Sequence, residues 1–290
     1  MSTPSLHGDL LDWWRRERRD LPWRRTRDPW AVLVSEAMLQ QTQVSRVVPR
    51  YAEFLKRFPD PASCAAAPVG DVLRAWAGLG YNRRAVHLHR AASAAVAEHG
   101  GRLPDDLDAL MALPGVGPYT ARAVLVFAHE RDLGLVDTNA GRFLARAGAG
   151  RPLTPREAQA RADELVPPGE GWAWGQAVFD LGATICRRRS PRCETCPVRR
   201  HCAWASAGWP DPDPVERSAG VSTAQAAFAG SDRQGRGRLV AALRAGPVAS
   251  PDVAATMGWS ADPDRAEAVV ARMLADGLVA QAETGDLRLP

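Results

Sequence analysis

The chain has 290 residues, with 37 Lys and Arg against 33 Asp and Glu, and five cysteines. This length is enough for two domains with well-filled cores. No stretch approaches eighteen uninterrupted apolar residues, which argues against secretion and against a membrane span. We therefore expect a cytoplasmic monomer with no membrane partner, a setting in which disulfide bonds are rare.

Charge is unevenly distributed along the chain. Residues 1–209 contain 29 basic and 22 acidic side chains, whereas residues 210–290 contain 8 and 11. The positive excess of the first part suits a polyanionic partner. A GC-rich genome that favours arginine explains the same charge equally well.

The predicted elements are mostly helices, because Ala, Leu and Arg dominate and apolar residues recur at three and four. The stretch "DPWAVLVSEAMLQQTQV", residues 28–44, is typical of a helix start. Asp28 can cap the helix, and Pro29 suits its first position. Glu36 lies in this helix, one turn after Val32 and Leu33.

The next motif, "LPGVGPYTARAVL" (113–125), predicts two helices joined by a tight glycine turn. Gly115 and Gly117 let the backbone approach a partner, and the free amides at the start of the second helix can bind a phosphate. An ordinary helix–turn–helix corner has the same pattern. Further on, Asp137 in "LVDTNAGR" precedes a helical stretch and is a candidate N-cap.

Four of the five cysteines lie in "CRRRSPRCETCPVRRHC". Their spacing, Cys-x6-Cys-x2-Cys-x5-Cys, places one short pair between two single cysteines: Cys186, Cys193, Cys196 and Cys202. Structural zinc sites usually show two separate short pairs. The spacing therefore favours a [4Fe–4S] cluster over zinc. Cys64, which lies among alanines, is expected to be a core thiol.

The last part of the chain has its own pattern. "WPDPDPVERSAGVS" indicates a linker. Helices are expected at 236–245, 251–257 and 263–276, followed by a small hairpin in "GLVAQAETGDLRL". Three helices and a hairpin resemble a winged helix.

Three of these motifs together resemble a known family. The cysteine spacing and the glycine hairpin are similar to those of the helix-hairpin-helix DNA glycosylases, which include endonuclease III. The series "LPWR…DPW…SEAMLQQTQV" resembles the amino terminus of the MutY family of adenine DNA glycosylases. The resemblance covers residues 8 to about 208. It implies a [4Fe–4S] cluster, mainly structural, and a basic loop of Arg187, Arg188, Arg189 and Arg192 that contacts the DNA backbone.

The resemblance also implies a mechanism. Asp137 would face the sugar and stabilise the oxocarbenium-like cation formed as the base departs, with Asn139 orienting water or Asp137. Tyr119 occupies the position of the lysine that bifunctional members use to cut the strand. The only lysine, Lys56, lies in no site motif. Because imine formation needs an amine, the resemblance implies a monofunctional glycosylase.

The choice of base depends on Glu36. Apolar neighbours would favour its protonated form near neutral pH, and adenine leaves readily only when a ring nitrogen is protonated. A solvated surface glutamate is the alternative. By the same resemblance, Arg19, Trp23 and Gln176 line an adenine pocket, while Gln41 and Tyr81 enter the gap beside the orphan base. Two positions depart from the family pattern: Asn82 replaces a frequent tyrosine, and Thr138 a frequent glycine.

The sequence thus predicts an all-α helix-hairpin-helix DNA glycosylase fold with a small winged-helix-like tail. The expected divisions are a cluster domain (1–22 with 135–208), a six-helix domain (23–134), a linker (209–234) and the tail (235–290). The active site would lie in the cleft between the first two. The expected partner is duplex DNA with adenine opposite 8-oxoguanine or guanine. A non-catalytic iron–sulfur DNA-binding protein and a glycosylase for another mismatched base are the alternatives.

The tail is too short for the Nudix-related domain with which MutY proteins commonly help to read 8-oxoguanine. Lesion recognition is then expected to rest on Gln41, Tyr81 and nearby backbone. Since an acidic tail gains little from phosphates, we expect it to pack on the core or to contact another protein.

Overall fold

The computed structural model of the protein describes residues 5–219 and 227–290. The chain divides into two compact units, each built from two separate stretches. Unit 1 comprises Met1–Pro29 and Pro118–Ala224, and unit 2 comprises Trp30–Gly117 and Gln225–Pro290. No helix of the described part is long and apolar enough to cross a lipid bilayer.

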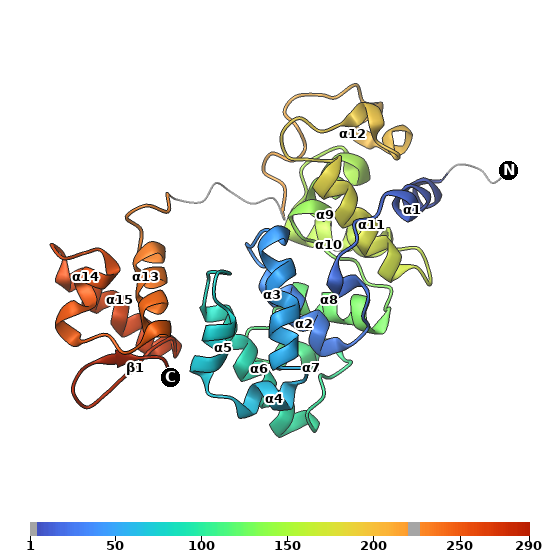
Figure 1. Ribbon diagram of the computed structural model, residues 1–290. Helices are drawn as coiled ribbons and strands as arrows, with labels where there is room; N and C mark the ends of the chain where they lie inside the picture. The colour runs from blue at the N-terminus through green and yellow to red at the C-terminus, as the bar shows by residue number, and fades with distance from the viewer. Residues whose placement is uncertain (1–4, 220–226) are drawn as a thin grey trace. The chain divides into compact units, whose positions relative to one another are not determined.

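The first stretch of unit 2 is a bundle of helices (Figure 1). They are α2 (Pro29–Leu39), α3 (Val44–Arg57), α4 (Pro61–Ala66), α5 (Val69–Ala75), α6 (Arg83–His99) and α7 (Leu107–Ala112). Helix α2 begins at Pro29, as predicted, and is buried from Trp30 to Met38. Phe54 and Trp76 meet edge to face at 5.9 Å. Cys64 is a buried core thiol, as predicted, and burial raises its pKa to about 12.

Unit 1 gathers the start of the chain around a later helix (Figure 1). Its elements are α1 (Leu6–Glu17), η1 (Pro22–Arg24), α8 (Pro118–His129), α9 (Thr138–Phe143), η2 (Leu144–Ala149), α10 (Pro155–Glu164), α11 (Gly171–Thr184), η3 (Cys193–Thr195), η4 (Arg199–His201) and α12 (Ala203–Ser206). Helices α1 and α9 both pack against α11. Leu10, Trp14, Phe143 and Leu181 are central to the core that they share.

The second stretch of unit 2 is the tail. It contains α13 (Asp232–Ala245), η5 (Ser250–Asp252), α14 (Val253–Met257), α15 (Pro263–Asp276), β1 (Ala280–Gln281) and β2 (Leu287–Arg288). The strands are antiparallel, with Ala280 opposite Arg288. Leu239, Met257 and Met273 are buried among these elements. The predicted order of three helices and a hairpin is confirmed.

The predicted linker, 209–234, lies partly outside the described residues, which omit 220–226. Its last residues are already helical, because Ser231 caps α13 by accepting a hydrogen bond from the Gln234 amide at 3.3 Å. The other domain boundaries inferred from the sequence remain predictions.

The glycine turn between α7 and α8 requires glycine at one position only. Gly115 has φ +78°, and a Cβ there would lie 2.5 Å from the Cβ of His87. Gly117 has neither constraint, because a Cβ there would meet no atom within 4 Å. The backbone at Gly117 is therefore open to an approaching molecule.

These two glycines give a matched test of the turn. Gly115→Ala should lower the free energy of unfolding by about 1–3 kcal/mol, because it adds both a steric overlap and a left-handed strain. Gly117→Ala should change it by less than about 0.5 kcal/mol. Urea denaturation followed by tryptophan fluorescence measures both; equal effects would contradict this account of the turn.

Candidate active site

Asp137 is the N-cap of α9, as the sequence predicts. Its Oδ1 accepts hydrogen bonds from the amides of Asn139 (2.8 Å) and Ala140 (2.7 Å), and its Oδ2 accepts one from Asn139 Nδ2 (2.8 Å). Burial raises the pKa of Asp137, while these hydrogen bonds and the charge of Arg142 oppose the rise. A desolvated, oriented carboxylate of this kind can stabilise a developing positive charge.

The orientation of Asn139 is fixed by a second contact. Arg142 Nη2 donates to Asn139 Oδ1 at 2.7 Å, so the amide nitrogen of Asn139 faces Asp137. The same guanidinium donates to the carbonyls of Thr138, Gly182 and Cys186. Gly182 belongs to α11, and a Cβ there would lie 2.6 Å from Asn139 Cβ. The close approach of α11 to α9 therefore needs this glycine.

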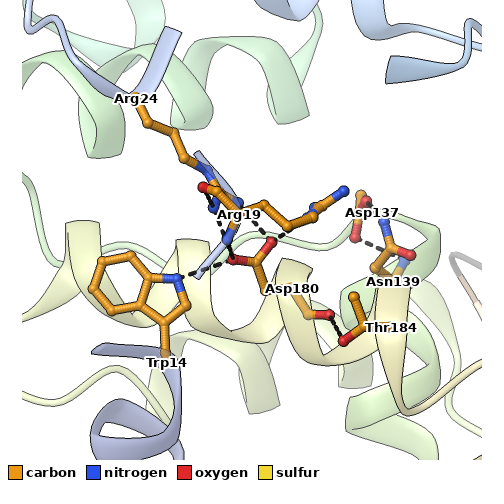
Figure 2. Close-up of polar contacts among 7 residues, drawn as sticks. All are labelled: Trp14, Arg19, Arg24, Asp137, Asn139, Asp180 and Thr184. Atoms are coloured by element: carbon orange, nitrogen blue, oxygen red, sulfur yellow. Dashed lines mark hydrogen bonds and ion pairs between the residues drawn. The ribbon is translucent and has the colours of Figure 1, made fainter. Parts of the chain in front are cut away.

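Asp180 on α11 has an exposed fraction of 0% and gathers five donors (Figure 2). They are Trp14 Nε1 (3.1 Å), Arg19 N (3.2 Å), Arg19 Nε (2.5 Å), Arg24 Nη1 (2.7 Å) and Arg24 Nη2 (2.8 Å). Burial alone would raise the pKa of Asp180, but Arg24 and Arg19 hold it below its ordinary value. The bidentate pair with Arg24 supplies direction as well as charge.

Of the three residues predicted to line an adenine pocket, one contacts this carboxylate and the other two lie near it or its partners in the chain. Arg19 contacts it directly, and buried Trp23 lies in the short turn η1 that ends with Arg24. Gln176 is buried one turn before Asp180 on α11. The structure thus places Arg19, η1 and the Gln176 turn of α11 around one buried anion.

Sequence reasoning missed Asp180, Arg24 and Arg142. A signal existed for the first, since "AVFDLGA" puts a single acid in an apolar helix. A carboxylate buried there needs cationic partners. The sequence does not say which of the many arginines supply them.

Glu36, predicted to be the acid, belongs to unit 2, whereas Asp137 belongs to unit 1. Its exposed fraction is 6%, and Val32 and Leu33, one turn before, are almost fully buried. The solvated-surface alternative for Glu36 is therefore wrong. Gln41, two residues beyond α2, is exposed, with φ +54°.

Tyr81 shares the unusual backbone of Gln41, with φ +46°. Arg84 connects the two segments that carry them. Its guanidinium donates to the carbonyls of Ala37, Met38, Gln40, Leu79 and Gly80 and to Thr42 Oγ1, over 2.6–3.2 Å. Burial lowers the pKa of Arg84 to about 10, so the group stays charged at neutral pH. Residues predicted to enter the gap in DNA are thus held by one cation.

The four clustered cysteines line one small cavity. Phe143, Leu181, Ile185 and Val198 supply apolar walls. Arg146 Nη1 lies 3.5 Å from Cys186 Sγ. Within the described residues, no three or more His, Cys, Asp or Glu side chains are arranged to hold a single metal ion. A single tetrahedral ion would need four ligands that converge on one point.

Of the basic loop between the cysteines, Arg188, Arg189 and Arg192 are exposed. Arg187 is half-buried and donates to the carbonyl of Ser190 at 3.1 Å. Tyr119, at the second position of α8, is half-buried.

Comparison with known proteins identifies the family of the chain. Residues 34–168 match the family described as "HhH-GPD superfamily base excision DNA repair protein". A solved structure titled as a thermostable thymine-DNA glycosylase superposes with a TM-score of 0.66 and 31% identity, covering 69% of this chain and 94% of that one. The chain belongs to the HhH-GPD superfamily of base excision DNA repair proteins.

Two relatives that match almost the whole chain are adenine DNA glycosylases. The protein from Mycobacterium tuberculosis is 42% identical over 289 residues, covering 97% of this chain and 92% of its own. The protein from Mycolicibacterium smegmatis is 41% identical over 285 residues, covering 97% and 94%. The similarity therefore extends into the tail.

The Asp180 cluster predicts a pH dependence of stability. Because the pKa of Asp180 is depressed in the folded state, its ionised form stabilises the fold above about pH 4, and this contribution is lost as the pH falls through the folded value. Asp180→Asn should cost about 3 kcal/mol at pH 7, since it leaves buried arginines uncompensated.

The loss in free energy of unfolding caused by Asp180→Asn should become smaller towards pH 3. Urea denaturation at a series of pH values measures it. Asp12→Asn is the control, because the Asp12–Arg15 pair is exposed and should contribute little. An Asp180→Asn protein as stable as the wild type at pH 7 would contradict the role of the cluster.

Proposed function

We propose that the protein is a monofunctional adenine DNA glycosylase that removes adenine opposite 8-oxoguanine or guanine. The observation that carries the proposal is similarity to adenine DNA glycosylases over 97% of the chain. Two carboxyl groups of the kinds that the chemistry needs support it: Glu36, which is buried beside apolar side chains, and Asp137, which is oriented as an N-cap. A protein that only binds DNA needs neither.

In the proposed reaction, adenine is flipped out of the duplex into a pocket formed by Arg19, Trp23 and Gln176. Glu36, buried among apolar side chains, donates a proton to a ring nitrogen of the base. As the glycosidic bond breaks, its electrons leave with adenine and positive charge develops on the sugar. Asp137 stabilises that charge, with its carboxylate oriented by Asn139. Water adds to the sugar and loses a proton, which leaves an abasic site.

Strand cleavage through an imine is not part of the proposal. Tyr119 offers no amine where bifunctional relatives have lysine, and the only lysine, Lys56, is in α3. Gly115 and Gly117 present the hairpin backbone to a phosphate, and Arg188, Arg189 and Arg192 contact the DNA backbone. Gln41 and Tyr81 enter the gap opposite the orphan base.

The four cysteines would hold a [4Fe–4S] cluster. When bound, it supplies a structural cross-link among the four thiolates and takes no part in base removal. The apolar cavity and the lack of convergence on one ion support a cluster over zinc. The protein should act on nucleoid DNA.

The test of the proposed function is single-turnover excision on duplexes with A opposite 8-oxoguanine, G or C, and with T opposite G. We expect adenine release from the first two, and a product strand that breaks only after alkali. Release of thymine but not adenine would favour the alternative, a glycosylase for another mismatched base. The similarity of this chain to a thymine-DNA glycosylase structure makes thymine the base to test.

Glu36→Gln and Asp137→Asn should each bind A:8-oxoguanine DNA and lose at least about 100-fold in excision rate. Asp137→Asn should unfold at no lower temperature than the wild type. Asparagine is also a good N-cap, and the raised pKa of Asp137 means that its ionised form costs stability above that pKa. Near-normal turnover in either variant would disprove the mechanism.

Anaerobically purified protein should contain about four irons per chain. It should absorb broadly at about 400 nm, through thiolate-to-iron charge transfer. Cys196→Ser should lose iron and colour. Cys64→Ser is the control, because Cys64 lies in unit 2 and should leave the iron content unchanged. Stoichiometric zinc in place of iron would overturn the cluster assignment.

A further inference from the structure

The tail contacts the turn that carries Tyr81. From α13, Arg233 Nη1 donates to Tyr81 Oη at 3.2 Å, and its guanidinium lies 5.9 Å from the centre of the Tyr81 ring. The same guanidinium lies 5.2 Å from the ring of Phe228. Arg233 thus bridges an aromatic residue of the tail and Tyr81.

Arg244, at the other end of α13, contacts Asn82, the residue that follows Tyr81. Its Nη2 donates to Asn82 Oδ1 at 2.9 Å, and its Nε donates to the carbonyl of Leu73 at 3.0 Å. Asn82 is one of the two departures from the family pattern. Its side-chain oxygen thus accepts a hydrogen bond from the tail.

Other contacts anchor the tail along its length. The carbonyl of Pro290 accepts a hydrogen bond from the Gly70 amide at 2.8 Å, and a Cβ on Gly70 would lie 2.7 Å from that oxygen. Arg90 Nη2 donates to the carbonyl of Asp276 at 3.2 Å. The tail therefore contacts the α5–α6 segment at three places: through α13, through the end of α15 and through Pro290.

The turn itself needs such support. Tyr81 has a left-handed backbone, which costs a residue with a side chain about 1–2 kcal/mol. Arg84 holds the carbonyls of Leu79 and Gly80, on the chain before Tyr81. Arg233 and Arg244 hold the side chains of Tyr81 and Asn82. The position of the Tyr81 side chain therefore depends on the tail.

We propose that the tail sets the preference for the orphan base by holding the Tyr81–Asn82 turn, with Arg233 and Arg244 as positioning residues. The inference rests on the proposed function of Tyr81. The tail acts through the turn and does not read the lesion itself.

A double-mutant cycle in the full-length protein tests this. The quantity measured is the ratio of single-turnover efficiencies, rate over half-saturating enzyme concentration, on A:8-oxoguanine and A:G duplexes. Arg244→Ala and Asn82→Ala should each reduce this ratio by roughly threefold to tenfold, the range expected for loss of a charge-assisted hydrogen bond. Because both substitutions remove the same contact, the ratio in the double variant should be no lower than in the single variant with the lower ratio.

Arg272→Ala is the matched control. Arg272 is an exposed arginine of the tail that pairs with Asp232, which also belongs to the tail. Its loss should leave the ratio unchanged, and the salt dependence of binding should be the same in Arg244→Ala and in the control.

Additive effects of Arg244→Ala and Asn82→Ala, or an unchanged ratio in both, would overturn the inference. If Arg244→Ala does not fold, Asn82→Ala and Arg233→Ala decide, because each removes a contact from one side. Absence of adenine release by the wild type would instead refute the proposed function, which makes the two failures distinguishable.

Discussion

A single buried carboxylate organises unit 1. Asp180 has no exposed surface, yet it is ionised, so it has to collect enough donors to replace its hydration. Those donors come from α1, from the segment that follows it and from η1, and each precedes Asp180 by more than 150 residues. A neutral side chain at this position would remove the reason for the two arginines to converge. The geometry of Arg19 and of the turn with Trp23 follows from that charge.

Asp137, the N-cap of α9, shows the opposite balance of effects on its pKa from that found at Asp180. Asp137 also accepts several hydrogen bonds, but its donors are neutral, and burial prevails, so its pKa is raised. The pKa shifts of these two aspartates thus differ in direction because arginines pair directly with only one of them. The paired carboxylate stabilises the fold, and the less compensated one remains able to respond to a new positive charge. This difference is what a site for a sugar cation requires.

Much of this could be predicted from the sequence where a motif is local. The cysteine spacing, the glycine turn, the N-cap at Asp137 and the helix from Pro29 each depend on residues close together in the chain, and the fold class was correct for the same reason. Asp180–Arg24 and Arg244–Asn82 could not be predicted, because each joins residues more than 150 positions apart and arginine is too abundant here to indicate a pairing. Arg84 was missed because its partners are mostly backbone carbonyls, which carry no sequence signal. The roles of Glu36, Gln41 and Gln176 stay predictions.

The interleaving of the two units has a consequence for biosynthesis. Helix α1 leaves the ribosome early, with Leu10, Leu11 and Trp14 prepared for burial, but its partner α11 is made about 160 residues later. At ordinary translation rates that interval lasts on the order of ten to thirty seconds. During that time the bundle of unit 2, whose residues 30–117 are contiguous, can form first. A helix whose apolar face stays exposed until its partner is made is a natural client for a ribosome-associated chaperone.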